Sequence, residues 1–417
     1  VVVASDLYEE APIWYLRVKQ AAERGATLIV LNPRETKLDK YASFVVRYAY
    51  GDEAKTVHDL SKKSKISDAF MKNENAVILY GSEGLGVTGS ASVASACAKL
   101  LHDNERVGKP NNGLVGVWER ANDQGAWEIG FNVEEDLVKA LKGKSVYLVG
   151  VDPVADDPKL AKALEGAEFV AVQDVIETAT TEIADVVLPA QAFTEREGTF
   201  TSGERRVQRF YPAVPVTGEA KPDFSITSQI ARHMGVILEG TSISALFDIL
   251  SDSVKSFEGL NYAKLAEVKA QWPIVGRGDL YYGGTTYENK HGMGVHLSAA
   301  AGRGEKVSIS RVQSEAAPRP KENELLAVPV TKLYDRGTTV MPAELLHGRI
   351  GEATIALHPD AAQNLGVEAG QTVNVSFNGV SGEVVVKLDD TISVGVALVP
   401  RSMGIAIREP VAVKVKP

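Results

Sequence analysis

The sequence predicts an α/β protein with two doubly wound parallel-sheet halves, followed by a small β-barrel. Three observations lead to this prediction. Short apolar runs alternate with helical stretches up to about residue 192, part of that pattern is repeated, and from about residue 325 the pattern becomes all-β. Alternating strands and helices are typical of parallel sheets covered by helices, and short strands separated by turns are typical of barrels.

Composition limits the function classes. The 417 residues suffice for two or three domains, and 44% apolar with 24% charged residues is typical of a globular protein. No apolar run approaches the roughly 20 residues that cross a bilayer, so we expect no membrane insertion. The net charge of −9 argues against a nucleic-acid partner, whose phosphates bind basic surfaces.

The strand candidates of the α/β part are apolar almost throughout, as in strands that are covered on both faces. Helical stretches fill the gaps between them, which indicates parallel pairing. The chain opens in what resembles a strand already under way, so we expect a fragment that lacks its natural N-terminus. The candidate strands are residues 1–5, 27–32, 44–48, 76–81, 145–150, 168–173 and 185–189.

Two segments, beginning at Val3 and Val149, share a pattern. In each, a strand ends before an aspartate (Asp6 or Asp152), a proline follows six residues later, and a Gly-Ala pair precedes the next strand. Proline suits the first turn of a helix and glycine its end. Two such halves predict a ligand crevice at the carboxyl ends of their strands. Chance similarity between two βαβ units is the alternative.

The rest of the chain divides into an excursion and a barrel. Residues 193–317 mix charges, glycine and threonine, with an amphipathic helix expected at 223–234 and a Gly- and Tyr-rich loop at 276–294. Residues 314–324 are predicted to be a linker. Beyond it, β-rich runs surround one short helix at 359–365, as in a small barrel. The predicted domains are 1–75, 76–144, 145–317 and 325–417.

Residues 76–101, AVILYGSEGLGVTGSASVASACAKLL, hold a G-x-G-x-x-G motif between a strand and a helix. Such a loop lets the backbone approach a phosphate at a helix N-terminus. A dinucleotide site also needs an acidic residue at the end of the next strand, and the window DNERVGKPNNG has no strand before its acids. Gly81, Gly84 and Gly86 therefore either approach a ligand or pack the loop against the helix.

Polar residues end the second strand of each repeat. Asp174 carries a carboxylate that can accept the paired N–H donors of guanine or the hydroxyls of a ribose, whereas Asn32 keeps the shape without the charge. Turn formation or helix capping is the alternative role for both.

No catalytic constellation and no metal site is predicted. Cys97 is the only cysteine, so the chain lacks the roughly four thiolates of an iron–sulfur cluster, and we expect this thiol to be buried. The seven histidines include no pair at metal-ligand spacing. The stretch EREGTFTSGERRVQR contains Glu197, Arg205 and Arg206 without a histidine or nucleophile, which favours a solvated or interface cluster over acid–base chemistry.

The stretch NNGLVGVWERANDQGAWEIGF is predicted to be a loop rich in tryptophan and amides. Tryptophan is enriched at the centres of protein interfaces. Trp118 and Trp127 are therefore interface candidates.

Together these segments resemble the molybdopterin oxidoreductases over nearly the whole chain. ETATTEIADVVLP, the pattern E-x-x-GTF and RRVQR are similar to a signature of that family. The resemblance implies two pterin guanine dinucleotides between the two halves and a barrel of the double-psi type over them. It also implies that one pterin lies beside Gly81, Gly84 and Gly86, one guanosine beside Asp6, Asn32 and Pro33, and the other beside Asp152 and Asp174.

Within that family, GLVGVWERANDQGAWEIG and GDLYYGGTTYEN most resemble the C-terminal part of the large iron–sulfur subunits of bacterial NADH–quinone oxidoreductase, respiratory complex I. This implies a non-catalytic scaffold in the peripheral arm, on the cytoplasmic side of the cell membrane. Its partners would be other subunits and the polypeptide's own N-terminal domain, whose iron–sulfur clusters carry electrons from NADH towards quinone.

Three departures from the active pattern support an empty scaffold. The metal ligand would lie before Val1, Asn32 replaces the usual carboxylate, and the barrel carries TKLYDRGTTVMPAELLHG in place of a His/Thr-rich pterin-binding segment. We therefore expect no cofactor in this chain. Two other functions stay open: an active molybdenum or tungsten enzyme, such as a formate dehydrogenase or nitrate reductase, and a free NAD-binding protein.

Overall fold

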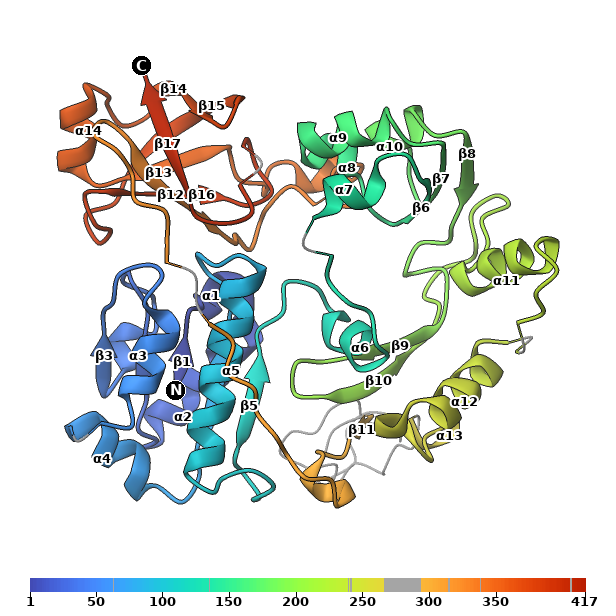
Figure 1. The fold of residues 1–417 in the computed structure, drawn as a ribbon, viewed down its shortest axis with the longest axis horizontal. Coiled ribbons are helices and arrows are strands. Elements are labelled where there is room, and N and C mark those ends of the chain that lie inside the picture. The colour runs from blue at the N-terminus through green and yellow to red at the C-terminus, as the bar shows by residue number, and fades with distance from the viewer. Residues whose placement is uncertain are drawn as a thin grey trace. The chain divides into compact units, whose positions relative to one another are not determined.

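The computed structural model describes residues 1–417 other than 63, 135, 239, 241, 266–293, 314, 315, 338 and 406. The chain forms two compact units, considered separately below: Val1–Glu119 with Glu305–Pro417, and Arg120–Gly304. Figure 1 shows the order of the elements along the chain. Within the described residues, no helix combines the length and the apolar character needed to span a bilayer.

A five-stranded parallel sheet forms one part of the first unit, in the order β3-β2-β1-β4-β5. The order reverses between β1 and β4, which is the kind of switch point where doubly wound sheets bind ligands. Strands from both predicted segments, 1–75 and 76–144, therefore share one sheet. Its strands are β1 (Val2–Val3), β2 (Ile29–Leu31), β3 (Phe44–Val46), β4 (Val77–Tyr80) and β5 (Gly113–Gly116).

Both faces of this sheet carry a hydrophobic core, as predicted for a doubly wound sheet. Val2 and Leu79 pack on one face, and Val3, Ile78 and the fully buried Cys97 pack on the other. Neighbouring strand residues alternate between the two faces, so each strand is buried on both sides. The helical elements are α1 (Leu7–Glu10), α2 (Pro12–Glu23), η1 (Asp39–Tyr41), α3 (Glu53–Asp59), α4 (Lys65–Lys72) and α5 (Val87–Asp103).

The C-terminal part of the first unit is a closed barrel, as predicted, in the order β12-β16-β13-β15-β14-β17. The expected short helix is α14 (Pro359–Leu365), which ends at Gly366 with φ +68°. Asn378 and Gly379 both have positive φ and join β14 to β15 as a tight hairpin. The strands are β12 (Leu325–Val330), β13 (Thr354–Leu357), β14 (Thr372–Phe377), β15 (Val380–Leu388), β16 (Val396–Pro400) and β17 (Val411–Lys416), with η4 (Glu344–Leu346) between β12 and β13.

The second unit contains the second repeat. Its parallel sheet has the order β6-β7-β8, and Figure 1 shows helices α7–α10 gathered beside these strands. Asp152 caps α8 as Asp6 caps α1, and Pro158 opens α9 as Pro12 opens α2. The elements are α7 (Leu137–Leu141), β6 (Ser145–Val149), α8 (Pro153–Asp156), α9 (Pro158–Leu164), β7 (Phe169–Asp174), α10 (Ala179–Glu182) and β8 (Val186–Pro189).

The excursion of the second unit is more ordered than the sequence indicates. Its charged stretch folds into a hairpin of β9 (Gly198–Thr201) and β10 (Arg206–Phe210), with β11 (Val295–His296) beside β10. The predicted amphipathic helix is α11 (Asp223–His233). Nearly all of the predicted loop 276–294 lies outside the described residues. The other elements are α6 (Asp123–Glu128), α12 (Ile243–Ser253), η2 (Lys255–Phe257), α13 (Tyr262–Leu265) and η3 (Ala301–Arg303).

Candidate functional site at the switch point of the first sheet

Three charged side chains meet where β1, β2 and β4 end. Asp6 follows β1, Arg34 follows β2 and Glu83 follows β4. The Arg34 Nε and Nη2 atoms donate to the two carboxylate oxygens of Glu83 at 2.7 and 2.9 Å, and Nη2 also donates to Asp6 Oδ2 at 3.0 Å. Their exposed fractions are only 7% (Asp6), 8% (Arg34) and 2% (Glu83). We call this buried group the switch-point cluster.

A third carboxyl group, Glu10, adjoins the switch-point cluster. Ser5 Oγ donates to Glu10 Oε2 at 2.7 Å. Removal from water, and then the charge of Glu83, raises the pKa of Glu10 to about 8. Burial by itself lowers the pKa of Arg34, but the carboxylates of Glu83 and Asp6 outweigh burial and raise it. Arg34 is therefore charged, and Glu10 is mainly neutral at pH 7.

The Asn32 side chain points into the interior of its unit and is hydrogen-bonded there. It is fully buried, its Oδ1 accepts the Arg34 backbone N–H at 3.1 Å, and its Nδ2 donates to the Ser5 carbonyl at 3.5 Å. These bonds fit the alternative role of turn formation. Pro33, the next residue, is partly exposed.

The glycines of the β4–α5 loop are required by close packing. A Cβ on Gly81 would lie 2.6 Å from the Ala4 carbonyl oxygen, and one on Gly84 would lie 2.6 Å from the Tyr50 ring. A Cβ on Gly86 would meet the Glu409 carboxylate at 2.8 Å. Gly84 also has φ +71°, a conformation that favours glycine.

Three backbone N–H groups of this loop donate to carbonyls of the same unit. The N–H of Glu83 donates to the Ala4 carbonyl at 2.9 Å, that of Gly84 to the Pro329 carbonyl at 3.3 Å, and that of Leu85 to the Ser82 carbonyl at 3.0 Å. A phosphate-binding loop presents such N–H groups to its ligand. The N–H groups of Glu83, Gly84 and Leu85 are therefore not available to a phosphate, and beside them the Arg34 guanidinium is already paired with carboxylates of the chain itself.

The second half, in the other unit, differs at the equivalent positions. The Asp152 carboxylate is used within the protein, since its Oδ1 accepts the Thr180 N–H at 3.0 Å and the Thr180 hydroxyl at 2.6 Å. Asp174 is 7% exposed, and its Oδ1 accepts the Val175 N–H at 2.7 Å. Its buried Oδ2 has no hydrogen-bond partner among the described residues. A buried carboxylate oxygen without a donor fits the N–H or O–H group of a ligand.

The two tryptophans predicted at interfaces lie in different surroundings. Trp118 is partly buried: it contacts Tyr80 edge-on at 6.4 Å between ring centroids, and a Cβ on Gly116 would lie 2.8 Å from its ring. Trp127, on α6, is 57% exposed. Trp127 is thus the one of the pair that stands free for a partner in the described part of the chain.

The charged interface candidates are paired within their own unit. Arg205 binds Glu128 at 2.5 Å, and the guanidinium of Arg206 binds Glu204 at 3.0 Å. Glu197 accepts from Arg209 at 2.9 Å. The Arg205–Glu128 pair joins the β9–β10 hairpin to α6, whereas the other two pairs form within the hairpin and the residue that precedes it. The side chains of these residues are partly exposed and still reach the surface.

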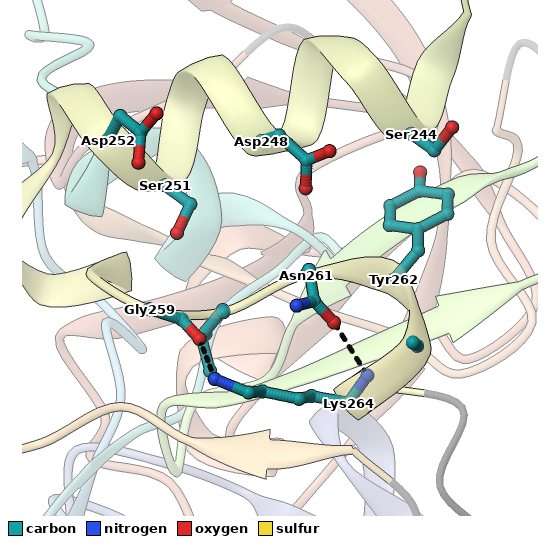
Figure 2. A pocket seen from close by; sticks show the side chains of 10 residues that line it. Ser244, Asp248, Ser251, Asp252, Gly259, Asn261, Tyr262 and Lys264 are labelled. Carbon is teal, nitrogen blue, oxygen red and sulfur yellow. Dashed lines mark hydrogen bonds between the residues drawn. The ribbon is translucent and has the colours of Figure 1, made fainter.

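A polar cavity of about 650 Å³ lies in the second unit, between α12 and the segment that leads into α13 (Figure 2). Asp248 and Asp252 lie one turn apart on α12, and across from them Lys264 Nζ donates to the Gly259 carbonyl. Its lining holds neither histidine nor cysteine. Over all described residues, no three His, Cys, Asp or Glu side chains gather as metal ligands do.

Sequence reasoning missed Arg34, Glu83 and Glu10. Two signals were present: a charged residue inside a glycine-rich loop (G-S-E-G), and an arginine directly after a buried strand end (N-P-R). Neither signal identifies its partner, because Arg34 and Glu83 are 49 residues apart in sequence.

Comparison with known proteins assigns the fold and its relatives. A family described as "Molybdopterin oxidoreductase" matches residues 1–233. F420-dependent formate dehydrogenase 1 subunit alpha of Methanococcus maripaludis is 25% identical over 96% of this chain and 71% of its own length. Formate dehydrogenase H of Escherichia coli is 36% identical over 34% of this chain and 21% of its own length. The structure of acetylene hydratase from Pelobacter acetylenicus has a TM-score of 0.65 and 15% identity, and covers 93% of this chain and 68% of its own.

Proposed function

Because the chain belongs to the molybdopterin oxidoreductase family, we propose that it is the structural scaffold region of an oxidoreductase subunit. The supporting observation is the switch-point cluster. Asp6, Arg34 and Glu83 pair with one another at the switch point, where we infer that a ligand would otherwise lie. Three N–H groups of the β4–α5 loop donate to carbonyls of the same unit. We infer from this self-paired site that the first half serves as architecture, since function must be argued from the site and not from the fold.

The assembly that we propose for this scaffold is the peripheral arm of respiratory complex I, on the inner face of the cell membrane. Support comes from the resemblance of residues 113–130 and from the exposed Trp127, a side chain suited to the centre of a protein interface. Electron transfer from NADH to quinone would then use iron–sulfur clusters outside these 417 residues.

The second candidate is a molybdenum or tungsten oxidoreductase, such as a formate dehydrogenase. The names of the relatives favour this candidate over complex I. The second half also favours it, because Asp174 Oδ2, which has no donor among the described residues, suits an N–H donor of a guanine base. When bound, the pterin dinucleotide supplies the metal centre for redox chemistry. The residues of this chain would then only hold its nucleotide.

Metal and pterin analysis of the whole natural protein separates the two candidates. The protein is purified from its own cells without chelators, its molybdenum and tungsten are measured by mass spectrometry, and its pterin is extracted and detected by fluorescence. The scaffold predicts neither metal nor pterin. Stoichiometric metal with pterin, both reduced in an Asp174→Asn variant, supports the enzyme and overturns the scaffold.

A further inference from the structure

We propose that Glu83 is a built-in anion that takes the place of a ligand phosphate at the switch point of the first sheet. The inference rests on the closed first half of the proposed scaffold and names the residue that closes it. It predicts that removal of the Glu83 carboxylate turns Arg34 into a receptor for a phosphate-class anion.

The chemistry of Arg34 supports this inference. A guanidinium binds carboxylates and phosphates with the same pair of parallel N–H bonds. Both Glu83 oxygens accept such bonds from Arg34, at 2.7 and 2.9 Å. The pair is almost fully buried, and in such low-dielectric surroundings these bonds are stronger than they would be in water.

The position of Glu83 is the second argument. In doubly wound folds the loop between the switch-point strand and the next helix is where a phosphate sits. Glu83 lies in that loop, between β4 and the 17-residue helix α5. Its backbone N–H donates to the Ala4 carbonyl at 2.9 Å, which fixes the side chain beside the end of β1. The Glu83 carboxylate thus belongs to the β4–α5 loop, which is the segment that would otherwise bind the phosphate.

The local charge is the third argument. Arg34 already has Asp6 as a partner at 3.0 Å, so it does not need Glu83 to avoid being a buried, unpaired cation. Two carboxyl groups thus share one guanidinium. Loss of Glu83 leaves Asp6 on Nη2 and frees the Nε side of the guanidinium, which an incoming anion can then bind.

The experiment compares anions on the Glu83→Ala variant of the full chain. Thermal unfolding is measured at pH 7 and constant ionic strength in chloride, acetate or inorganic phosphate. We expect the variant to unfold at a lower temperature than the unmodified chain in chloride, and phosphate to restore part of the difference. The unmodified chain should not respond to phosphate, and neither should the Glu83→Ala/Arg34→Met double variant.

Acetate is the decisive comparison, because it replaces only the carboxylate that was removed. Restoration by acetate but not by phosphate identifies an ordinary buried ion pair and overturns the inference, as does an equal phosphate response in the double variant. If Glu83→Ala does not fold in chloride, its refolding yield from denaturant in the three anions gives the same comparison. Metal or pterin in the natural protein would overturn the proposed scaffold. The anion selectivity of the Glu83→Ala variant is measured independently of that result, so the two failures can be told apart.

Discussion

Glu10, which adjoins the switch-point cluster, makes the free energy of unfolding depend on pH. Its pKa is 4.5 in an ordinary environment and about 8 in the folded protein, because the group is removed from water and lies near Glu83. Between these two values the folded state binds more protons than the unfolded state, so the free energy of unfolding falls as pH rises from about 4.5 to about 8. Above the folded pKa this dependence disappears.

A Glu10→Gln variant tests this residue, since glutamine resembles the neutral acid. We expect the variant to have a higher free energy of unfolding than the unmodified chain at pH 8. Its free energy of unfolding should also lack the decrease that Glu10 causes between pH 5 and pH 8. Parallel denaturant titrations of both proteins measure this difference. Glu23→Gln on α2, where the half-exposed carboxylate pairs with Lys19 at 3.7 Å, is the matched control. An unchanged pH dependence in Glu10→Gln contradicts the assignment.

Sequence reasoning placed polar residues correctly but did not assign their roles. Asp6, Asn32 and Asp174 were predicted at strand ends, and they are there. Their roles depend on partners: Asp6 binds Arg34, which is 28 residues away, whereas one oxygen of Asp174 is left without a donor. A periodic pattern identifies the end of a strand but not the side chains that other strands bring to it.

At the scale of elements, the β4–α5 loop shows why a glycine motif does not by itself indicate a nucleotide. Gly81→Ala places a Cβ 2.6 Å from the Ala4 carbonyl oxygen and 2.7 Å from the Ser5 Cβ. Backbone cannot move aside as the end of a side chain can, so we expect a loss of about 1–3 kcal/mol in the free energy of unfolding without any ligand. Denaturant titration measures it. Gly113→Ala, in open space on β5, is the control, and equal stability of the two variants contradicts a packing role.

Arg106 stabilises the C-terminal end of α4 through hydrogen bonds. Its guanidinium donates to the carbonyls of Phe70, Asn73 and Glu74 at 2.7–3.0 Å. In the sequence, the whole of α5 separates these residues from Arg106. Arg106→Ala removes all three bonds, including the buried bond to the Phe70 carbonyl, and we expect a loss of about 2 kcal/mol in the free energy of unfolding. Hydrogen exchange should rise mainly in α4 and in residues 73–76.

Arg106→Lys is the informative partner variant for that prediction. One ammonium group cannot reach all these carbonyls, so its stability should lie between those of Arg106→Ala and the unmodified chain. Exchange that rises equally over the whole first unit would show that Arg106 does not act on this element in particular.

The elements that the sequence missed share a physical cause. The strand β5 is only GLVG, with two glycines and no longer apolar run, yet it pairs with β4 over four positions. Strands β9 and β10 contain GTFT and RVQRF, whose polar residues are paired or face outward. Tertiary pairing, and not local propensity, makes these segments strands.

At the scale of the whole chain, the first unit is built from two distant segments. Residues 1–119 and 305–417 join because the barrel returns to the sheet after the second unit has been completed. Contacts at this junction include the Gly84 N–H with the Pro329 carbonyl, and the Glu9 carboxylate with the Leu333 N–H at 3.0 Å. The sequence predicted the barrel itself from its alternation of strands and turns. It could not predict where the barrel docks, because the groups in contact lie far apart in sequence, as Glu9 and Leu333 do at a separation of 324 residues.

Arg401 provides the test of this junction. From the end of β16 it donates to the Ser82 carbonyl in the glycine loop at 2.7 Å and pairs with Glu119 at 3.1 Å. Both of these partners belong to the sheet segment, and a third bond, to the Arg408 carbonyl at 3.1 Å, stays within the C-terminal segment outside the barrel strands. Arg401→Met should therefore loosen the docking of the barrel while leaving the hydrogen bonds between its strands intact. We expect faster hydrogen exchange in residues 81–90 and little change in β13–β15. Arg349→Met, at an exposed position before β13, is the control. Equal acceleration in the barrel strands would mean that Arg401 stabilises the barrel itself and not its attachment to the sheet.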